Sequence, residues 1–223
     1  MTEALILSGR GRYEDPWHEF AGTSHLLALE LSRLGINPQV RSTFPSSAAD
    51  LASFDLLVVN AGSGRVDAQY DGADEDWKDF HSAINQHTAA GKPVLAVHQS
   101  ANTFEDNPQW FAALGGRWEP EVSMHPEQGE AVFYTVSGHP ITAGLPPQLR
   151  TVDERYSYLV QYGPVTPLIQ HEHDGVLHVA AWVHQEAPYR VVYDAMGHDL
   201  PAFANPDRLA LLHAEVRWLL SGD

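Results

Sequence analysis

Four histidines occupy positions at which side chains could carry out chemistry. His98 follows the apolar run 94–97, His125 and His139 each precede a proline, and His198 follows a glycine. In α/β proteins, polar residues at the carboxyl ends of parallel strands line the crevice in which ligands bind. The sequence therefore predicts one pocket lined by these histidines, with His98 at the end of a central strand.

A carboxylate among imidazoles can support two kinds of chemistry. An imidazole has an unperturbed pKa of about 6.5, so His98 could donate or accept a proton at neutral pH, with Glu154 as the complementary acid or base. Two or three imidazoles and Glu154 could instead bind zinc or a similar divalent ion. The sequence has no His-Glu-x-x-His motif, so metal ligands would have to converge from distant loops. The spacing leaves both alternatives open.

The position of each residue on its strand indicates which groups can face such a pocket. Asp153 and Glu154 are neighbours, and on an extended segment their side chains point to opposite sides. We expect Glu154 to be the one that faces the pocket. His171, His173 and His178 flank a predicted hairpin, and we expect them to be solvated strand positions rather than a metal cluster.

The chain contains no cysteine, which excludes disulfides, thiolate metal ligands and cysteine nucleophiles. A serine nucleophile is not indicated either, because the segment 97–101 lacks the Gly-x-Ser-x-Gly pattern that exposes a serine at a strained turn. We expect Ser100 to be a helix N-cap instead.

The charge balance narrows the class of partner. Lys and Arg total 13 against 29 for Asp and Glu, a formal net charge of −16, which opposes binding to nucleic acid or to an anionic membrane surface. A neutral or cationic small molecule fits better. No apolar run reaches membrane-spanning length, and the start of the chain lacks the basic flank of a signal peptide, so we expect a cytoplasmic protein. Exposed Trp and Tyr residues would allow a homo-oligomer.

Hydrophobic patterns predict the elements that position these residues. Apolar runs indicate strands over 4–8, 39–43, 55–60 and 94–97. Leucines at helical spacing before Gly35 predict one helix, and Trp77, Phe80 and Ile84 mark the inner face of another. This alternation predicts an α/β fold with a doubly wound, mostly parallel sheet flanked by helices.

The second half of the chain is richer in strands. We expect strands over 131–136, 165–171, 176–183 and 189–193, with a hairpin turn at Asp174 and Gly175. A final helix should run from about 206 to 220, capped by Asn205 with Pro206 in its first position. No linker interrupts the 223 residues, so we expect a single domain over 1–223 with a strand-rich insertion in its second half.

An ordered set of motifs resembles the ThuA-like (trehalose utilisation) family, a branch of the class I glutamine amidotransferase-like superfamily with a flavodoxin-like fold. The set comprises the strand ending at His98, the segment from Leu114-Gly115-Gly116 to His125-Pro126, His139-Pro140-Ile141-Thr142-Ala143-Gly144-Leu145-Pro146, Asp153-Glu154-Arg155-Tyr156, Val191-Val192-Tyr193, Gly197-His198-Asp199, and Asn205-Pro206 with the helix ending in Trp218. Together these motifs extend over nearly the whole chain.

The resemblance implies a carbohydrate-utilisation protein whose ligand is a small-molecule sugar. Related amidotransferases carry a cysteine at the turn that follows the strand ending here at His98, so a glutaminase is excluded. The expected function is acid–base chemistry, with or without a metal, on a trehalose-like disaccharide or its 3-keto derivative, as an isomerase, lyase or hydrolase. Alternatives are a non-catalytic sugar-binding or sensory domain and a metal-dependent hydrolase. The residues implied are His98, Glu154 and His198 for catalysis and His18, Gln99, His125, His139 and Tyr156 for substrate binding.

Overall fold

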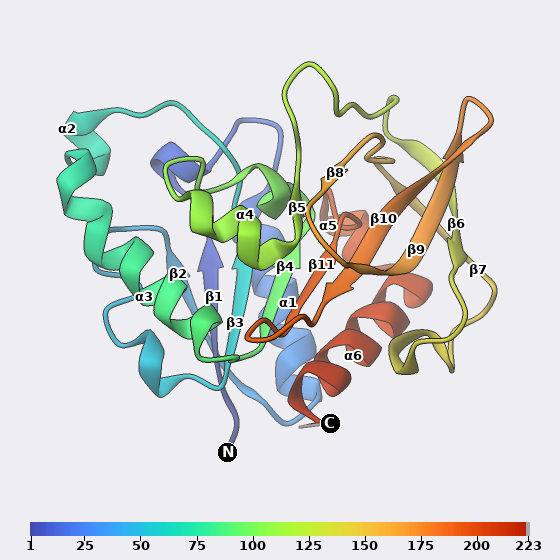
Figure 1. Cartoon of the computed structure of the whole chain (residues 1–223), viewed down its shortest axis with the longest axis horizontal. Helices are drawn as coiled ribbons and strands as arrows, with labels where there is room; N and C mark the ends of the chain where they lie inside the picture. The colour runs from blue at the N-terminus through green and yellow to red at the C-terminus, as the bar shows by residue number, and fades with distance from the viewer. Residues whose placement is uncertain (222–223) are drawn as a thin grey trace.

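A computed structural model describes residues 1–221, which fold around a nine-stranded sheet (Figure 1). The strands follow one another in space as β2 (Asn37–Ser42), β1 (Glu3–Ser8), β3 (Leu56–Asn60), β4 (Val94–Val97), β11 (Val191–Asp194), β10 (Val176–His184), β9 (Thr166–His173), β6 (Gly129–Thr135) and β7 (Gln148–Asp153). A separate small sheet pairs β5 (Gly116–Arg117) with β8 (Val160–Gln161).

The half of the sheet from β2 to β11 is parallel. Strands β3, β4 and β11 are buried at every residue, as their continuous apolar sequences predicted for strands covered on both faces. Val58 of β3 pairs with Ile6 on one side and Leu95 on the other. This register brings the carboxyl ends of β1, β3 and β4 to the same edge of the sheet.

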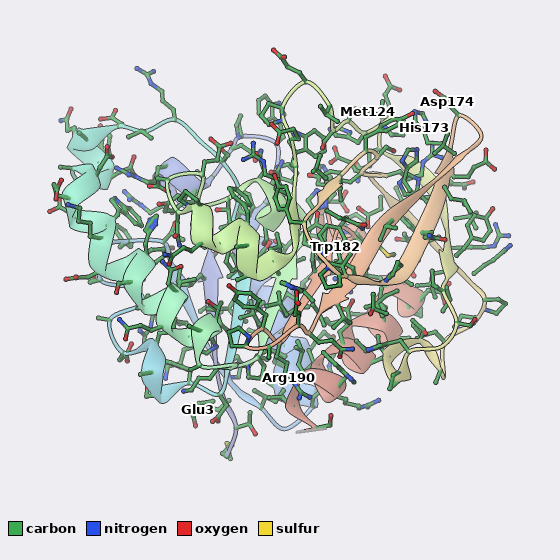
Figure 2. All side chains as sticks on the ribbon, in the orientation of Figure 1. Glu3, Met124, His173, Asp174, Trp182 and Arg190 are labelled. Atoms are coloured by element: carbon green, nitrogen blue, oxygen red, sulfur yellow. The ribbon has the colours of Figure 1, made fainter. Side chains whose placement is uncertain are left out.

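The strand-rich second half of the chain extends the same sheet in antiparallel fashion, from β10 to β7. Asp174 lies at the tip of the β9–β10 hairpin (Figure 2). The backbone φ angle is 51° at Asp174 and 75° at Gly175. Positive φ at both central residues is what a two-residue hairpin turn requires, and the predicted turn is confirmed.

Two histidines on this hairpin are less exposed to solvent than predicted. His171 and His178, expected to be solvated, are buried. The segment after β7 covers them: the ring of His171 lies 2.8 Å from the carbonyl oxygen of Tyr156, and Nδ1 of His178 accepts the backbone N–H of Tyr158 at 3.3 Å. Alternation along a strand could not reveal that a loop covers its outer face.

Helices cover both faces of the sheet. On one face lie α1 (Phe20–Arg33), α5 (Leu200–Phe203) and α6 (Pro206–Leu220), and His213 of α6 contacts Glu30 of α1 at 2.8 Å. On the other lie α3 (Lys78–Ala89) and α4 (Pro108–Leu114), linked through Asn85 and Asn107. The shorter segments are α2 (Ala68–Asp71), η1 (Gly11–Tyr13), η2 (Leu51–Ser53), η3 (Asp74–Trp77), η4 (His98–Asn102) and η5 (Pro140–Thr142).

Within residues 1–221, no helix combines the length and apolarity needed to cross a membrane.

Helix α6 begins where the sequence predicted. The Asn205 side chain accepts the backbone N–H groups of Asp207 and Arg208, and Pro206 occupies the first helical position. An N-cap of this type satisfies two of the four amide groups that a helix leaves unpaired at its start.

The first turn of α6 also inserts a cation into the core. The Arg208 guanidinium lies 3.0 Å from Asp194 Oδ2 and 3.9 Å from Glu215 Oε2, and all three side chains are fully buried. Burial raises the pKa of Glu215 well above its usual value. This favours the protonated form of Glu215, and the closest partner of the Arg208 cation is Asp194 at the end of β11.

Replacing Arg208 with methionine should destabilise the protein by about 3–5 kcal/mol, because it leaves the Asp194 carboxylate buried without its partner. Urea unfolding followed by circular dichroism measures the change. Arg217→Met, at an exposed position of the same helix, is the matched control and should change the free energy of unfolding by less than about 0.5 kcal/mol. Equal stability of Arg208→Met and the wild type would contradict the account of this ion pair.

Candidate active site

Five of the eight predicted site residues come from separate loops and converge on one cluster. His18 lies in the loop after β1, His98 directly follows β4, and His198 lies after β11. Glu154 directly follows β7, and His125 lies between β5 and β6. The structure thus brings these five residues together beside the strand ends, where the sequence analysis expected them.

The Glu154 carboxylate lies at the centre of the cluster. Its Oε2 is 3.4 Å from Nε2 of His98 and 3.3 Å from Nδ1 of His198, and its Oε1 is 3.5 Å from Nδ1 of His125. The Glu154 side chain is only 10% exposed. It faces the cluster, as expected, whereas the Asp153 side chain points away to a different set of partners; alternation predicted that the two neighbours would point to opposite sides.

The contacts between Glu154 and the imidazoles set their charges. Burial opposes ionisation of Glu154, but its contacts with His198 and His98 outweigh burial and lower its pKa. Burial likewise opposes protonation of His198, yet the contact with Glu154 raises its pKa. Burial dominates at His98 and lowers its pKa to about 4. The cluster thus pairs an ionised carboxylate and a readily protonated His198 with a neutral His98.

His98 adopts a backbone conformation that is uncommon outside glycine. Its φ is 48°, at the turn where β4 passes into η4. This left-handed conformation costs a non-glycine residue about 1–2 kcal/mol. Two hydrogen bonds hold it: the Tyr193 hydroxyl donates to the carbonyl of His98 at 2.9 Å, and Nδ1–H of His98 donates to the carbonyl of Ala195 at 2.5 Å. They leave Nε2 of His98 directed into the cluster.

Asp15 orients the imidazole of His18. Its Oδ1 accepts the backbone N–H groups of Trp17 and His18, and it lies 2.6 Å from Nδ1 of His18. Nε2 of His18 then lies 3.1 Å from Nε2 of His98. Sequence analysis missed Asp15, although the spacing Asp15-Pro16-Trp17-His18 is typical of a turn in which an aspartate caps the following amides.

Tyr156 contacts the cluster, and Gln99 follows His98 in the chain. The Tyr156 hydroxyl lies 3.0 Å from Nε2 of His98, and its ring centroid is 4.8 Å from that of Trp118. Burial raises the pKa of Tyr156 well above its usual value, so the hydroxyl keeps its proton. Oε1 of Gln99 is buried without a hydrogen-bond partner in the described part of the chain. His125, with 38% of its side chain exposed, is the most open member of the cluster.

Asp153 joins two of the loops that supply the cluster. Its carboxylate accepts the backbone N–H groups of Gly197 at 2.8 Å and His198 at 3.1 Å. Burial raises the pKa of Asp153 to about 7, even though these amide donors favour the ionised form. The residue that turns away from the pocket therefore fixes the position of His198 relative to Glu154.

The expectation that His139 lines the same pocket is wrong. Its Nδ1 accepts the backbone N–H of Ile141 at 3.2 Å, so His139 is the N-cap of η5, and its ring packs against Trp218. His139 lines a separate cavity beside α6.

The expectation for Ser100 also changes: it is the third residue of η4 rather than the cap, and its buried hydroxyl donates to the carbonyl oxygens of Val59 and Val97.

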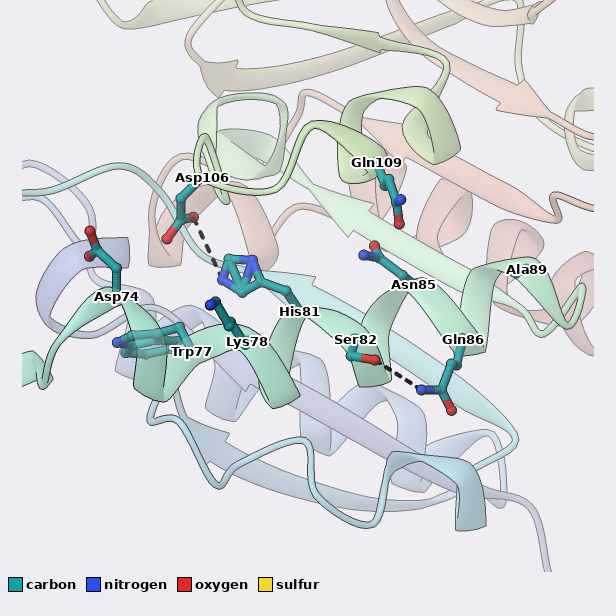
Figure 3. Close-up of a pocket in the computed structure, with 10 residues that line it drawn as sticks. All are labelled: Asp74, Trp77, Lys78, His81, Ser82, Asn85, Gln86, Ala89, Asp106 and Gln109. Carbon is teal, nitrogen blue, oxygen red and sulfur yellow. Dashed lines mark hydrogen bonds and ion pairs between the residues drawn. The ribbon is translucent and has the colours of Figure 1, made fainter.

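Another hollow follows α3 and is shown in Figure 3. The titratable groups at its end are already paired: the His81 ring lies 3.6 Å from the Asp106 carboxylate and 2.8 Å from the Tyr13 hydroxyl. In the histidine cluster, by contrast, Oε2 of Glu154 and Nδ1 of His198 have no hydrogen-bond partner among the described residues. Such atoms also occur in the core around Arg208, but those of the cluster lie beside the strand ends, which makes the cluster the candidate ligand site.

The cluster offers the atoms that a metal ion requires. His18, His98, His198 and Glu154 each provide one ligand atom, and these four atoms all lie within 4.8 Å of one another. Imidazole nitrogens with a carboxylate oxygen are a donor set found around zinc and related ions.

Asp153→Asn should lower the free energy of unfolding by about 1–3 kcal/mol, because the amide group presents a donor where a backbone N–H needs an acceptor. Urea unfolding measures the loss, and the backbone amide resonance of His198 should shift in NMR spectra. Asp79→Asn, on the exposed face of α3, is the control. An unchanged amide resonance of His198 would show that Asp153 does not position this loop.

The fold is shared with solved structures of low sequence identity. A protein described as ThuA-like from Parabacteroides merdae superposes with a TM-score of 0.79 at 15% identity, covering 99% of this chain and 90% of that one. Another from Bacteroides uniformis gives 0.76 at 17% identity, covering 100% and 92%. A glutamine amidotransferase from Thermotoga maritima gives 0.60 at 12% identity, covering 98% and 97%. The predicted class I glutamine amidotransferase-like fold is therefore confirmed.

Family membership follows from the sequence itself. None of the curated proteins matches the chain. The model of the ThuA family, described as trehalose utilisation, matches residues 11–219, which include every member of the histidine cluster. The chain therefore belongs to the ThuA family.

Proposed function

We propose that the protein is a carbohydrate-utilisation enzyme that acts on a trehalose-like disaccharide or its 3-keto derivative by acid–base chemistry in the histidine cluster. The observation that carries this proposal is the Glu154 carboxylate, buried and within 3.5 Å of three imidazoles. Membership of the trehalose utilisation family supports a sugar as the substrate. The absence of cysteine requires a chemistry without a thiolate nucleophile.

A 3-keto sugar offers a first step that such a cluster can catalyse. The carbonyl at C3 makes the hydrogen on C2 acidic, so a base can remove it while the electron pair moves toward the ketone oxygen. If that enolate expels the substituent at C1, the C1–O bond breaks and the leaving oxygen takes up a proton, which is the reaction of a lyase. Reprotonation at C2 on the opposite face instead inverts that carbon, which is the reaction of an isomerase, and addition of water to C1 of the elimination product gives net hydrolysis.

The geometry divides these tasks among the side chains. His98 and Glu154 lie in contact, and together they would remove the proton from C2 and return it. His198, on the other side of the carboxylate, would donate a hydrogen bond to the ketone oxygen as charge develops there. His125 lies at the open side, where His125, Tyr156 and Trp118 form a group of neighbouring rings against which a sugar could pack. Gln99 and His18 would bind hydroxyl groups.

Incubation of a 3-keto disaccharide with the protein in D₂O should replace the hydrogen on C2 with deuterium or consume the sugar, as followed by ¹H NMR. Glu154→Gln and His98→Asn should each slow the reaction by roughly 100-fold or more, the usual effect of losing an acid or base. Asparagine is chosen at position 98 because it tolerates the left-handed backbone.

His139→Ala is the matched control, since His139 lies outside the cluster, and it should react at the wild-type rate. Saturable binding without exchange or turnover would instead support a non-catalytic sugar-binding or sensory domain. Wild-type rates in both Glu154→Gln and His98→Asn would contradict the proposed chemistry.

A further inference from the structure

The ring nitrogens of His18 and His98 face each other with too few hydrogens between them. Nδ1 of His98 must carry a hydrogen, because the Ala195 carbonyl oxygen beside it can only accept. Nδ1 of His18 likewise donates to the Asp15 carboxylate. In neutral rings this leaves a lone pair on each Nε2, and these two atoms lie 3.1 Å apart. The Tyr156 hydroxyl, 3.0 Å from Nε2 of His98, supplies one hydrogen for two lone pairs.

The carboxylate side of the cluster also has unused hydrogen-bonding capacity. Oε2 of Glu154 and Nδ1 of His198 are buried and without hydrogen-bond partners within residues 1–221, although they lie only 3.3 Å apart. The Glu154 side chain is nine-tenths buried, and Oε2 points toward both His98 and His198. A buried carboxylate oxygen left without a donor costs about 1–3 kcal/mol or more. Nε2 of His18 and of His98 carry lone pairs and Glu154 is negatively charged, so a cation at the point where these atoms converge would be stabilised by all three.

Three of the six separations in the set are close to those around a tetrahedral transition-metal ion. Bonds of about 2.0–2.1 Å to nitrogen and oxygen place neighbouring ligand atoms roughly 3.3–3.5 Å apart. The observed distances are 3.1 Å between His18 and His98, 3.4 Å between His98 and Glu154, and 3.3 Å between Glu154 and His198. The largest separation in the set is within 4.8 Å, so the most distant pair has to move closer by up to about 1.4 Å for all four atoms to bind one ion.

The surroundings also suit a metal. Metal-binding histidines usually donate their second ring nitrogen to a carboxylate or a carbonyl, as His18 does to Asp15 and His98 to Ala195. Three nitrogens and one oxygen favour a first-row transition metal over magnesium or calcium, which prefer oxygen ligands.

We propose that His18, His98, His198 and Glu154 bind one divalent transition-metal ion, with Zn²⁺ as the probe. Binding itself is independent of the proposed function; only the role of the ion, polarising the ketone oxygen of a sugar, rests on that function. With the ion bound, His98 no longer moves protons, His198 no longer donates to the ketone oxygen and His18 no longer binds a hydroxyl group, because all three hold the ion. Oε1 of Glu154, which faces His125, remains for proton transfer.

Isothermal titration of the chelator-treated protein with ZnCl₂, in the absence of any sugar, tests the site. We expect one Zn²⁺ per chain, and roughly 100-fold or greater weakening in His18→Ala and in Glu154→Gln. Substitution with Co²⁺ provides a second readout, because its visible absorption reports nitrogen and oxygen ligands in a low-symmetry site. Circular dichroism establishes that each variant is folded.

His173→Ala is the matched control, because His173 belongs to the other histidine group, next to His178 on the β9–β10 hairpin. Unchanged Zn²⁺ affinity in His173→Ala supports the proposal, whereas no saturable binding, or equal affinity in His18→Ala and the wild type, overturns it. Deuterium exchange by metal-free protein would remove the ion from the mechanism and leave the proposed function intact. If the protein binds Zn²⁺ but the loaded protein shows no deuterium exchange, the metal site is supported and the proposed function is contradicted.

Discussion

Burial of the Glu154 carboxylate is the constraint on which the site depends. A carboxylate removed from water costs several kcal/mol unless nearby groups compensate its charge. Here the compensating groups are imidazoles supplied after β4, after β11 and between β5 and β6. They can reach one carboxylate only because the parallel strands end together at one edge and the antiparallel strands return the chain to the same place.

Two further buried carboxylates, those of Asp153 and Asp194, stabilise the loops that supply these imidazoles. Asp153 accepts the amide groups of the loop that carries His198. Asp194 pairs with Arg208 on one side and accepts the backbone N–H of Met196 on the other, so the residue between them, Ala195, is held in place. The carbonyl of Ala195 fixes which nitrogen of His98 carries the hydrogen. An ion pair in the core thus determines the tautomer of an imidazole in the site.

The elements of the fold were predictable where a local pattern dictates local structure. The apolar runs of β3 and β4, the Asp174-Gly175 turn and the cap at Asn205 each carry their own physical reason in adjacent residues. Within the site, alternation predicted that only one of Asp153 and Glu154 faces the cluster, whereas the choice of Glu154 rested on the resemblance to the ThuA-like family. These inferences needed no knowledge of distant contacts.

Errors arose where distant segments decide the environment. His139 and His198 both lie beside a glycine or proline, yet one packs against Trp218 and the other contacts Glu154. His171 and His178 have the sequence context of exposed strand residues and are covered by the loop after β7. No pattern of residue types marked the left-handed backbone of His98, because histidine is compatible with it without requiring it.

That backbone conformation limits which residues position 98 can hold. Residues branched at Cβ are strongly disfavoured there, whereas glycine, asparagine, aspartate and histidine are tolerated. Among these four, only histidine has a rigid ring whose two nitrogens point in different directions, one toward the Ala195 carbonyl and the other into the cluster. Steric selection by the main chain and the two-ended chemistry of imidazole therefore favour the same residue. The backbone of the turn after β4 therefore favours histidine at position 98 even in the absence of substrate.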